Sequence, residues 1–208
     1  MKNSFITFEG PEGSGKTSIL KAVEVYFKGL NIDTIATREP GGIKISEQIR
    51  QVILDVENKQ MDAKTEALLY AAARRQHMAE VILPALEKGQ TVLCDRFIDS
   101  SLAYQGVGRN LGIDEVLALN QFAIDYKLPD LTLFIDVPPE IGLKRVFSND
   151  RAVDRLDLES LAFHQRVYEG YMEIIQRYPN RIKIIDGTQE IEAVVKQVVE
   201  CIESFFKE

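Results

Sequence analysis

The first residues that could carry chemistry form a glycine-rich run near the start of the chain. Two glycines with four residues between them precede a lysine and a threonine, in the order Gly10-Pro11-Glu12-Gly13-Ser14-Gly15-Lys16-Thr17. Glycines let the backbone bend until several N–H groups point into one concavity. The lysine adds a full positive charge for β- and γ-phosphates, and the threonine hydroxyl can hold Mg²⁺. The pattern predicts a triphosphate-binding loop; a glycine-rich turn without a ligand is the alternative.

Charged residues also stand at the ends of two later apolar runs. Arg38 and Glu39 follow the second run, and Asp95 and Arg96 end the third. Each arginine carries a planar fork suited to bidentate contact with a phosphate. The carboxylates of Glu39 and Asp95 could orient a hydroxyl, hold metal-bound water or pair with the arginines. Surface ion pairs are the alternative, which the repetition at two strand ends disfavours.

Two helical stretches carry side chains suited to a planar base. Tyr70 and Arg74 are four residues apart, so a helix presents them on one face, where they offer stacking and hydrogen bonds. Ser101 and Gln105 share a helix face in the same way, and Tyr104 lies on a neighbouring one. Gln105 has both a donor and an acceptor, as a pyrimidine edge requires. Core packing and a capped surface helix are the alternatives.

A basic segment over residues 144–156 follows the fourth expected strand and shows little apolar periodicity. Such a segment beside a phosphate site is typical of a lid, which closes over the reactants and excludes water. Its candidates for stabilising charge on a transferring phosphoryl group are Arg151 and Arg155. A solvated basic loop is the alternative.

Short apolar runs alternate with longer helical stretches along the chain. We expect strands at residues 4–9, 33–37, 90–95, 131–137 and 181–185, and helices at 16–30, 45–54, 63–88, 99–107, 113–126, 139–147, 158–177 and 190–206. This alternation predicts an α/β fold: a doubly wound five-stranded parallel sheet with helices on both faces. Ligands of such sheets bind beyond the carboxyl ends of the strands. The length and the lack of a linker predict one domain over residues 1–208.

Composition narrows the class of protein. The chain has 25 Lys and Arg against 32 Asp and Glu, and its net charge of −7 argues against broad binding to nucleic acid or acidic membranes. We find no secretory leader and no apolar run long enough to span a bilayer. The spacing of Cys94 and Cys201 suits neither a metal site nor a disulfide framework. Together these features predict a cytoplasmic enzyme without a nucleic-acid or membrane partner.

Three stretches resemble the bacterial type of thymidylate kinase, within the phosphate-loop nucleoside-monophosphate kinases. They are Phe-Glu-Gly-Pro-Glu-Gly-Ser-Gly-Lys-Thr at 8–17, Thr-Arg-Glu-Pro-Gly-Gly at 37–42 and Asp-Arg-Phe-Ile-Asp-Ser-Ser-Leu-Ala-Tyr-Gln-Gly at 95–106. The resemblance covers essentially the whole chain, and the second and third stretches are more specific than the first. It implies an enzyme that moves the γ-phosphate of ATP onto dTMP with the help of Mg²⁺, giving dTDP for dTTP biosynthesis. It also implies a homodimer.

The resemblance further implies a role for each candidate residue. The loop residues 10–17 would bind ATP. Residues implied to act in catalysis are Lys16, Asp95, Arg96, Arg151 and Arg155. Residues implied to bind dTMP are Glu12, Arg38, Glu39, Arg50, Tyr70, Arg74, Arg96, Ser101, Tyr104 and Gln105. Thr17 would hold the metal, with Glu39 and Asp95 acting through water.

Within the dTMP site, the resemblance divides these residues by the part of the nucleotide that they contact. Arg38 and Arg96 would hold the phosphate, assisted by Arg50. Tyr70 would stack on thymine, while Arg74, Ser101 and Gln105 bind its edge. Tyr104 would crowd the sugar at the place of a ribose 2′-hydroxyl, and Glu12 would contact the 3′-hydroxyl. Because an amino group at C4 would present a donor to Arg74, we expect cytosine nucleotides to be poor substrates.

One departure from the family pattern concerns the phosphate loop. Some members carry an arginine within it, whereas the variable positions here are Pro11, Glu12, Gly13 and Ser14. The missing charge would then come from Arg151 or Arg155, as in the branch that keeps its arginines on the lid.

Two other functions use some of the same features. One is another deoxynucleotide or nucleoside kinase of the same fold, which a panel of substrates would separate. The other is a regulatory switch that hydrolyses GTP. Switches of that kind usually read guanine with Asn-Lys-x-Asp after a strand, but Asp136-Val137-Pro138-Pro139 follows the fourth strand here.

Overall fold

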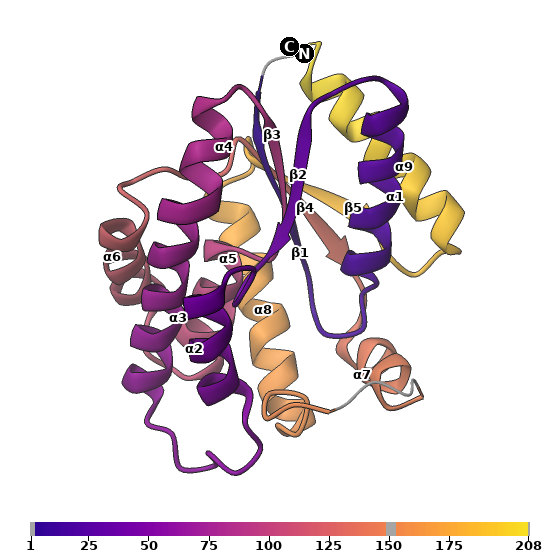
Figure 1. The fold of residues 1–208 in the computed structure, drawn as a ribbon. Helices are drawn as coiled ribbons and strands as arrows, with labels where there is room; N and C mark the ends of the chain where they lie inside the picture. Colours follow the sequence, from indigo (N-terminus) through magenta and orange to yellow (C-terminus); the bar gives the residue numbers. More distant parts are fainter. Residues whose placement is uncertain (1–2, 149–152, 208) are drawn as a thin grey trace.

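A five-stranded parallel sheet forms the centre of the protein, seen in a computed structural model that describes residues 3–148 and 153–207 (Figure 1). Its strands are β1 (Phe5–Glu9), β2 (Thr34–Arg38), β3 (Thr91–Asp95), β4 (Leu131–Asp136) and β5 (Ile182–Asp186). They lie in the order β2-β3-β1-β4-β5, and every neighbouring pair is parallel. The predicted doubly wound five-stranded sheet is therefore confirmed.

The central strands are apolar on both faces because helices cover both faces of the sheet. Phe5, Val92 and Leu133 are each fully buried in β1, β3 and β4. A parallel sheet of this kind requires near-continuous apolar strands instead of alternating ones, which is the pattern that the sequence carries. The edge strands β2 and β5 are only partly buried.

The helices of the protein divide into two layers and one element at the edge (Figure 1). One face of the sheet is covered by α1 (Lys16–Gly29) and α9 (Ile191–Phe205). The other face carries α2 (Lys44–Leu54), α3 (Ala63–His77), η1 (Met78–Ile82), α4 (Leu83–Glu87), α5 (Ile98–Ser101), η2 (Leu102–Gly108), α6 (Ile113–Ala123) and α8 (Leu161–Arg177). The last element, α7 (Pro139–Phe147), lies beside the loop that follows β1. None of these helices is long and apolar enough to cross a membrane, within the residues described.

The two faces of the sheet bury separate apolar clusters. Ile6, Val23 and Val198 belong to the cluster under α1 and α9. Phe5 and Tyr171 belong to the larger cluster on the opposite face. This larger cluster supports α3, η2 and α8, the elements that form the wall of the site described below.

The register of the strands brings their carboxyl ends to one edge. Asp95 at the end of β3 pairs with Arg38 of β2 on one side and with Phe8 of β1 on the other. The loop after β1 therefore begins beside the two arginine–carboxylate pairs of the sequence. This is the edge at which a doubly wound sheet binds ligands.

Two of the expected helices are interrupted by wider, π-type turns. The stretch at 63–88 divides into α3, η1 and α4, and Pro84 lies in the first turn of α4. Proline lacks the N–H of a helical hydrogen bond and crowds the preceding turn, which gives a physical reason for the wider turns before it. The stretch at 99–107 divides into α5 and η2. Turns of this type often occur at functional sites, and η2 carries Tyr104 and Gln105.

Two helix ends also differ from those expected. The helix expected from residue 158 begins at Leu161, because the Ser160 hydroxyl caps it by accepting a hydrogen bond from the N–H of Phe163. The helix expected to reach residue 126 ends at Ala123, and Asp125 and Tyr126 then adopt left-handed backbone conformations. Local backbone geometry of this kind is not encoded in apolar periodicity.

Candidate active site

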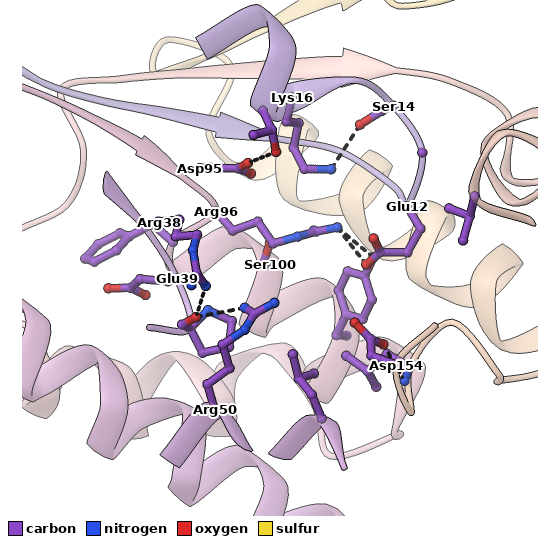
Figure 2. A pocket seen from close by; sticks show the side chains of 18 of the residues that line it. Glu12, Ser14, Lys16, Arg38, Glu39, Arg50, Asp95, Arg96, Ser100 and Asp154 are labelled. Carbon is purple, nitrogen blue, oxygen red and sulfur yellow. Dashed lines mark hydrogen bonds and ion pairs between the residues drawn. The ribbon is translucent and has the colours of Figure 1, made fainter. Parts of the chain in front are cut away.

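A cavity of about 580 Å³ opens at the carboxyl ends of β1, β2 and β3. It is lined by most of the residues that the sequence singled out: Glu12, Gly13, Ser14, Gly15, Lys16, Thr17, Arg38, Glu39, Arg50, Tyr70, Arg74, Asp95, Arg96, Ser101, Tyr104 and Gln105. Figure 2 shows Lys16 and Asp95 on one side, Arg38 and Arg50 on the other, and Arg96 between them, pointing toward Glu12. Among the predicted loop residues, Gly10 and Pro11 lie outside this lining.

The phosphate loop wraps around the ammonium group of Lys16. Nζ donates to the carbonyl oxygens of Gly10 at 3.1 Å and Pro11 at 2.8 Å, and to Oγ of Ser14 at 3.0 Å. Burial, with Arg96 as the second cause, lowers the pKa of Lys16 to about 8. The helix α1 begins at Lys16, so its positive dipole end faces the same concavity.

The backbone of this loop needs glycine at position 13. Gly13 has φ of 69°, and a Cβ placed there would lie 2.1 Å from the carbonyl oxygen of Gly142 in α7. A Cβ on Gly142 would likewise lie 2.1 Å from the carbonyl oxygen of Glu12. The two glycines allow the loop and α7 to pack backbone against backbone.

A hydroxyl and a carboxylate meet below the loop. Oγ1 of Thr17 donates to Oδ2 of Asp95 at 2.7 Å. Mg²⁺ is usually bound in proteins by one or two such oxygens, several waters and the phosphates of a substrate. Over the described residues, no group of three or more His, Cys, Asp or Glu side chains could hold a metal ion by itself. The Thr17–Asp95 pair therefore fits Mg²⁺ that arrives with a nucleotide.

Three guanidinium groups face the cavity. Arg38 and Arg50 lie opposite the phosphate loop, whereas Arg96 contacts the loop itself, because its Nη1 donates to the carbonyl oxygen of Gly10 at 3.0 Å. Arg96 donates to Oε1 of Glu12 at 2.7 Å and lies over the ring of Tyr104 at 5.2 Å. Arg38 and Arg50 both donate to the carbonyl oxygen of Pro40, at 3.1 and 2.8 Å. This concentration of charge suits an anionic ligand, and the planar fork of arginine suits a phosphate in particular.

The wall formed by α3 and α5 holds a buried arginine with most of its donors in use. The side chain of Arg74 is 1% exposed. Its Nε donates to Glu39 at 2.7 Å, Nη1 to Ser101 and to Asn120, and Nη2 to the carbonyl oxygen of Phe97 at 2.8 Å. Since a guanidinium has five N–H donors, one donor on Nη2 is left to face the cavity.

The carboxylate of Glu39 belongs to the same buried network. Oε1 lies 2.9 Å from Nδ1 of His77, and Oε2 accepts from Arg74. The other ring nitrogen of His77 lies 2.7 Å from Oγ1 of Thr37. Glu39 also lines the cavity, so its expected role in ordering metal-bound water stays a prediction. In this structure its carboxylate orients Arg74.

Tyr70 and Gln105 face the cavity from α3 and η2. Gln105 was expected to present both a donor and an acceptor. Its amide nitrogen donates one of its two hydrogens to Oε1 of Glu66 at 2.9 Å, which orients the amide, and its role toward a base stays a prediction. Burial raises the pKa of Tyr70 further above its ordinary value, so the phenol is neutral and can act as an uncharged stacking surface.

Neither arginine of the expected lid is placed in the cavity by the structure, unlike most of the other predicted site residues. Arg151 lies outside the described residues. Arg155 is 7% exposed and does not line the cavity, because its Nη2 donates to Glu66 at 2.5 Å and its Nε donates to the carbonyl oxygen of Ile53 at 2.8 Å. In this conformation Arg155 thus fastens the end of the segment to α3. Arg145 lines the cavity instead.

Several polar residues of the site were not recognised from the sequence. Glu9, Glu66, His77 and Asn120 are fully buried and contact residues that line the cavity. Their partners lie far away along the chain, so spacing alone could not reveal them. The one available signal was the position of Glu9, which ends a strand at the ligand-binding edge.

A parallel sheet whose phosphate loop shares one cavity with three guanidinium groups defines a phosphate-loop kinase of the nucleoside-monophosphate kinase class. Residues 8–198 match the thymidylate kinase family, and the chain belongs to that family. It is 60% identical over 198 residues to the thymidylate kinase of Clostridium novyi, covering 95% of this chain and 97% of that one. It is 56% identical over 208 residues to the thymidylate kinase of Anoxybacillus flavithermus, covering all of both chains.

A solved structure agrees with these sequence relatives. The crystal structure of thymidylate kinase from Ehrlichia chaffeensis superposes with a TM-score of 0.80 at 31% identity. The match covers 98% of this chain and 100% of that one. The predicted resemblance is therefore confirmed at the level of both sequence and fold.

Proposed function

We propose that the chain transfers the γ-phosphate of ATP to dTMP, giving dTDP, and that both nucleotides meet in the cavity at the sheet edge. The observation that carries this proposal is that Lys16 and its loop share one cavity with Arg96, which contacts the loop, and with Arg38 and Arg50, which lie opposite it. Direct phosphoryl transfer depends mainly on alignment and charge stabilisation, so two facing anion sites are the main requirement.

ATP would bind with its phosphates in the loop of residues 10–17. Lys16 would exchange its contacts with the loop carbonyls for contacts with the β- and γ-phosphates. Thr17 and Asp95 would hold Mg²⁺, which supplies charge neutralisation at the phosphates when it is bound. Arg145 lies close enough to line the same cavity and adds positive charge on the ATP side.

dTMP would bind with its phosphate on the three arginines and its base against α3. Tyr70 would stack on thymine, and the remaining donor of Arg74 would meet a carbonyl oxygen of the base edge. Tyr104 and Glu12 are hydrogen-bonded to one another at 3.0 Å and would border the sugar. Ser101 supports this arrangement indirectly, because its hydroxyl accepts from Arg74.

Arg151 and Arg155 remain candidates for stabilising charge on the transferring group. For Arg155 this role would require it to leave Glu66, since the observed ion pair holds its guanidinium away from the cavity. The ion pair therefore favours an anchoring role for Arg155, with catalytic charge supplied by other side chains.

The proposal is tested by a coupled assay with ATP and Mg²⁺ against dTMP, dUMP, dCMP, UMP and AMP. We expect dTMP to give the highest kcat/KM and dCMP to be poor, because the C4 amino group would face the donor of Arg74. A preference for another nucleotide would indicate a different kinase of the same fold. Equal turnover of dCMP and dTMP would remove the base-reading role of Arg74.

The same proposal extends to assembly and location. Large apolar side chains are exposed on the α3 and α6 side of the molecule, including Leu68 and Phe122, which supports a homodimer formed through these helices. Cys94 is buried and forms no disulfide within the described residues. An unoxidised cysteine of this kind suits a reducing compartment, which supports a cytoplasmic location.

A further inference from the structure

A buried carboxylate lies directly behind Arg96. Glu9 ends β1, is 0% exposed and does not line the cavity, so it touches neither nucleotide in the proposed arrangement. The donors to its carboxylate come instead from Ser100 and Tyr171, which both contact Arg96, and from the backbone of Phe97, which follows Arg96 in the chain. A buried charge is costly unless it is fully hydrogen-bonded, so its retention at this place calls for a function.

Four donors converge on the Glu9 carboxylate. Oε1 accepts from the backbone N–H groups of Phe97 at 2.7 Å and Ser100 at 3.2 Å. Oε2 accepts from Oγ of Ser100 at 2.5 Å and from the hydroxyl of Tyr171 at 3.0 Å. This set of donors suits an ionised carboxylate, which accepts hydrogen bonds and donates none.

The hydroxyls of Ser100 and Tyr171, which donate to Glu9, also accept hydrogen bonds from the Arg96 guanidinium. Nη1 of Arg96 donates to Oγ of Ser100 at 3.1 Å and to the hydroxyl of Tyr171 at 3.2 Å. A hydroxyl has one hydrogen, and when Glu9 takes it, only lone pairs remain for Arg96. Ionised Glu9 thereby turns both hydroxyls into acceptors on the side that faces Arg96.

The backbone of Arg96 is held by the same carboxylate. Arg96 has φ of 66°, a left-handed conformation that is unfavourable for a residue with a Cβ. The N–H of the next residue, Phe97, donates to Glu9, which fixes the turn immediately after this strained position. Both ends of the arginine, backbone and guanidinium, are therefore linked to one buried group, while Glu12 and the carbonyl oxygen of Gly10 also hold the guanidinium.

We infer that Glu9 is a positioning residue for dTMP phosphorylation, which holds the Arg96 guanidinium in the cavity through Ser100 and Tyr171. The inference rests on the proposed role of Arg96 at the dTMP phosphate. A preorganised guanidinium binds a phosphate without paying the cost of ordering its own side chain, so loss of Glu9 weakens dTMP binding and leaves ATP binding almost unchanged.

The protonation state of Glu9 adds a second readout. Burial, with Asp99 as the second cause, raises the pKa of Glu9 to about 7. The charged and titratable groups that face Glu9 are Arg96, Asp99, Lys16, Arg181, Cys94 and Tyr171. Protonation removes an acceptor and supplies a hydrogen, which frees one hydroxyl to turn its own hydrogen toward Arg96. Affinity for dTMP then falls as the pH drops below about 7.

The experiment compares wild type, Glu9→Gln and Asp99→Asn by calorimetry with dTMP and with ATP, and by steady-state kinetics. Asp99 is the matched control, because it is also a buried carboxylate but pairs with Arg181 and Thr132. For Glu9→Gln we expect the Kd and KM for dTMP to rise by about tenfold or more, with the KM for ATP within about twofold of wild type. Because Asp99 helps to raise the pKa of Glu9, the comparison is made above about pH 7.5, where Glu9 is ionised in both proteins and Asp99→Asn keeps the wild-type KM for dTMP.

The dependence of dTMP affinity on pH distinguishes a positioning role of Glu9 from a general effect of the substitution on the structure. The dTMP phosphate itself titrates near about pH 6, so the informative quantity is the ratio of wild-type to Glu9→Gln affinity. We expect this ratio to be largest above about pH 7.5 and to approach one below about pH 6, because protonated Glu9 resembles glutamine. A ratio that does not change with pH would overturn the inference.

A second variant keeps the test decisive if Glu9→Gln folds poorly. Tyr171→Phe removes one of the two hydroxyls and leaves the carboxylate in place. It should raise the Kd for dTMP by a few-fold, and in combination with Glu9→Gln the effects should be less than additive, because both act through one contact chain. An unchanged Kd in both single variants would overturn the inference.

The outcome also distinguishes this inference from the proposed function. If wild-type protein does not phosphorylate dTMP, the proposed function fails. If wild type is active and Arg96→Ala loses dTMP affinity while Glu9→Gln retains it, only the positioning role of Glu9 fails.

Discussion

At the scale of single residues, each functional cation of the cavity is held by an anion or a carbonyl oxygen. Arg96 is paired with Glu12, Arg74 with Glu39, and Lys16 with the carbonyl oxygens of its loop. A phosphate that enters the cavity therefore replaces existing contacts at groups that are already aimed into it. Such preorganisation lowers the entropic cost of binding.

Arg96 provides the most direct test of the dTMP side. Replacement by alanine removes the central guanidinium and leaves Glu12 without its ion-pair partner. We expect the Kd for dTMP to rise by about 100-fold, since charge-assisted bonds to phosphate are among the stronger ones. Calorimetry with dTMP and, separately, with ATP measures this, and the Kd for ATP should change much less. An unaltered Kd for dTMP would place Arg96 outside the site.

The environment of Lys16 predicts how kcat/KM for ATP depends on pH. Its pKa in the free protein is lowered to about 8 by burial and by Arg96. The ammonium is charged below that pH and attracts the phosphates, so kcat/KM for ATP should fall as the pH rises through about 8. In Lys16→Arg the charge persists over this range, and the fall should be absent even though the absolute rate is lower. Identical pH profiles in the two proteins would contradict this assignment.

The residues that stand next to one another in the sequence were predictable, and those joined only by the fold were not. The loop at 10–17 and the Arg38-Glu39 and Asp95-Arg96 pairs each carry their chemistry in adjacent positions. By contrast, the contacts of Glu9 with Tyr171 and of Glu39 with His77 join distant parts of the chain. No periodicity or spacing encodes a contact of that kind.

At the scale of elements, the site is built from strand ends, one phosphate loop and two interrupted helices. Strands could be predicted because their apolar runs are continuous, as burial on both faces requires. The π-type turns of η1 and η2 could not, because they preserve helical composition while changing the hydrogen-bond pattern. As a result, the apolar pattern located the segment of Tyr104 and Gln105 but not the orientation of its side chains.

The contact between the phosphate loop and α7 gives a prediction at this scale. In Gly142→Ala the new Cβ would lie 2.1 Å from the carbonyl oxygen of Glu12, so either the loop or α7 must move. We expect the KM for ATP to rise by about tenfold, because displacement of a phosphate-binding backbone weakens several contacts at once. Steady-state kinetics with varied ATP measures the change.

A matched control for this substitution lies at the end of α1. A Cβ on Gly29 would meet no atom within 4 Å, and its backbone conformation is not left-handed. Gly29→Ala should therefore leave the KM for ATP unchanged and stabilise the protein slightly, by up to about 1 kcal/mol. Equal kinetic effects of the two substitutions would argue against a specific loop–α7 contact.

At the scale of the whole molecule, the sheet separates two apolar clusters, and two of the most exposed apolar residues lie close together in the chain. Phe122 and Tyr126, at the end of α6, are 82% and 74% exposed. Arg75 of α3 contacts this end of α6 through the carbonyl oxygen of Ala123. Large exposed aromatic residues at one place are typical of an interface between protein chains.

The proposed homodimer can therefore be tested with one charge. Phe122→Glu places a carboxylate where the proposed interface would bury it, and we expect the protein to become monomeric at micromolar concentration. Light scattering coupled to size exclusion measures the mass. Val25→Glu is the control, because Val25 is 71% exposed on α1, which covers the opposite face of the sheet. A dimer that persists in Phe122→Glu would place the interface elsewhere.

Glu12 belongs to the loop that would receive ATP, yet its carboxylate accepts hydrogen bonds from Arg96 and Tyr104 on the dTMP side. Glu12 thus joins the two proposed nucleotide sites, and a shift of its side chain at one site would alter the other. Whatever factor ATP applies to the affinity for dTMP, dTMP must apply the same factor to the affinity for ATP. The binding of the two substrates would then be coupled through the side chain of Glu12.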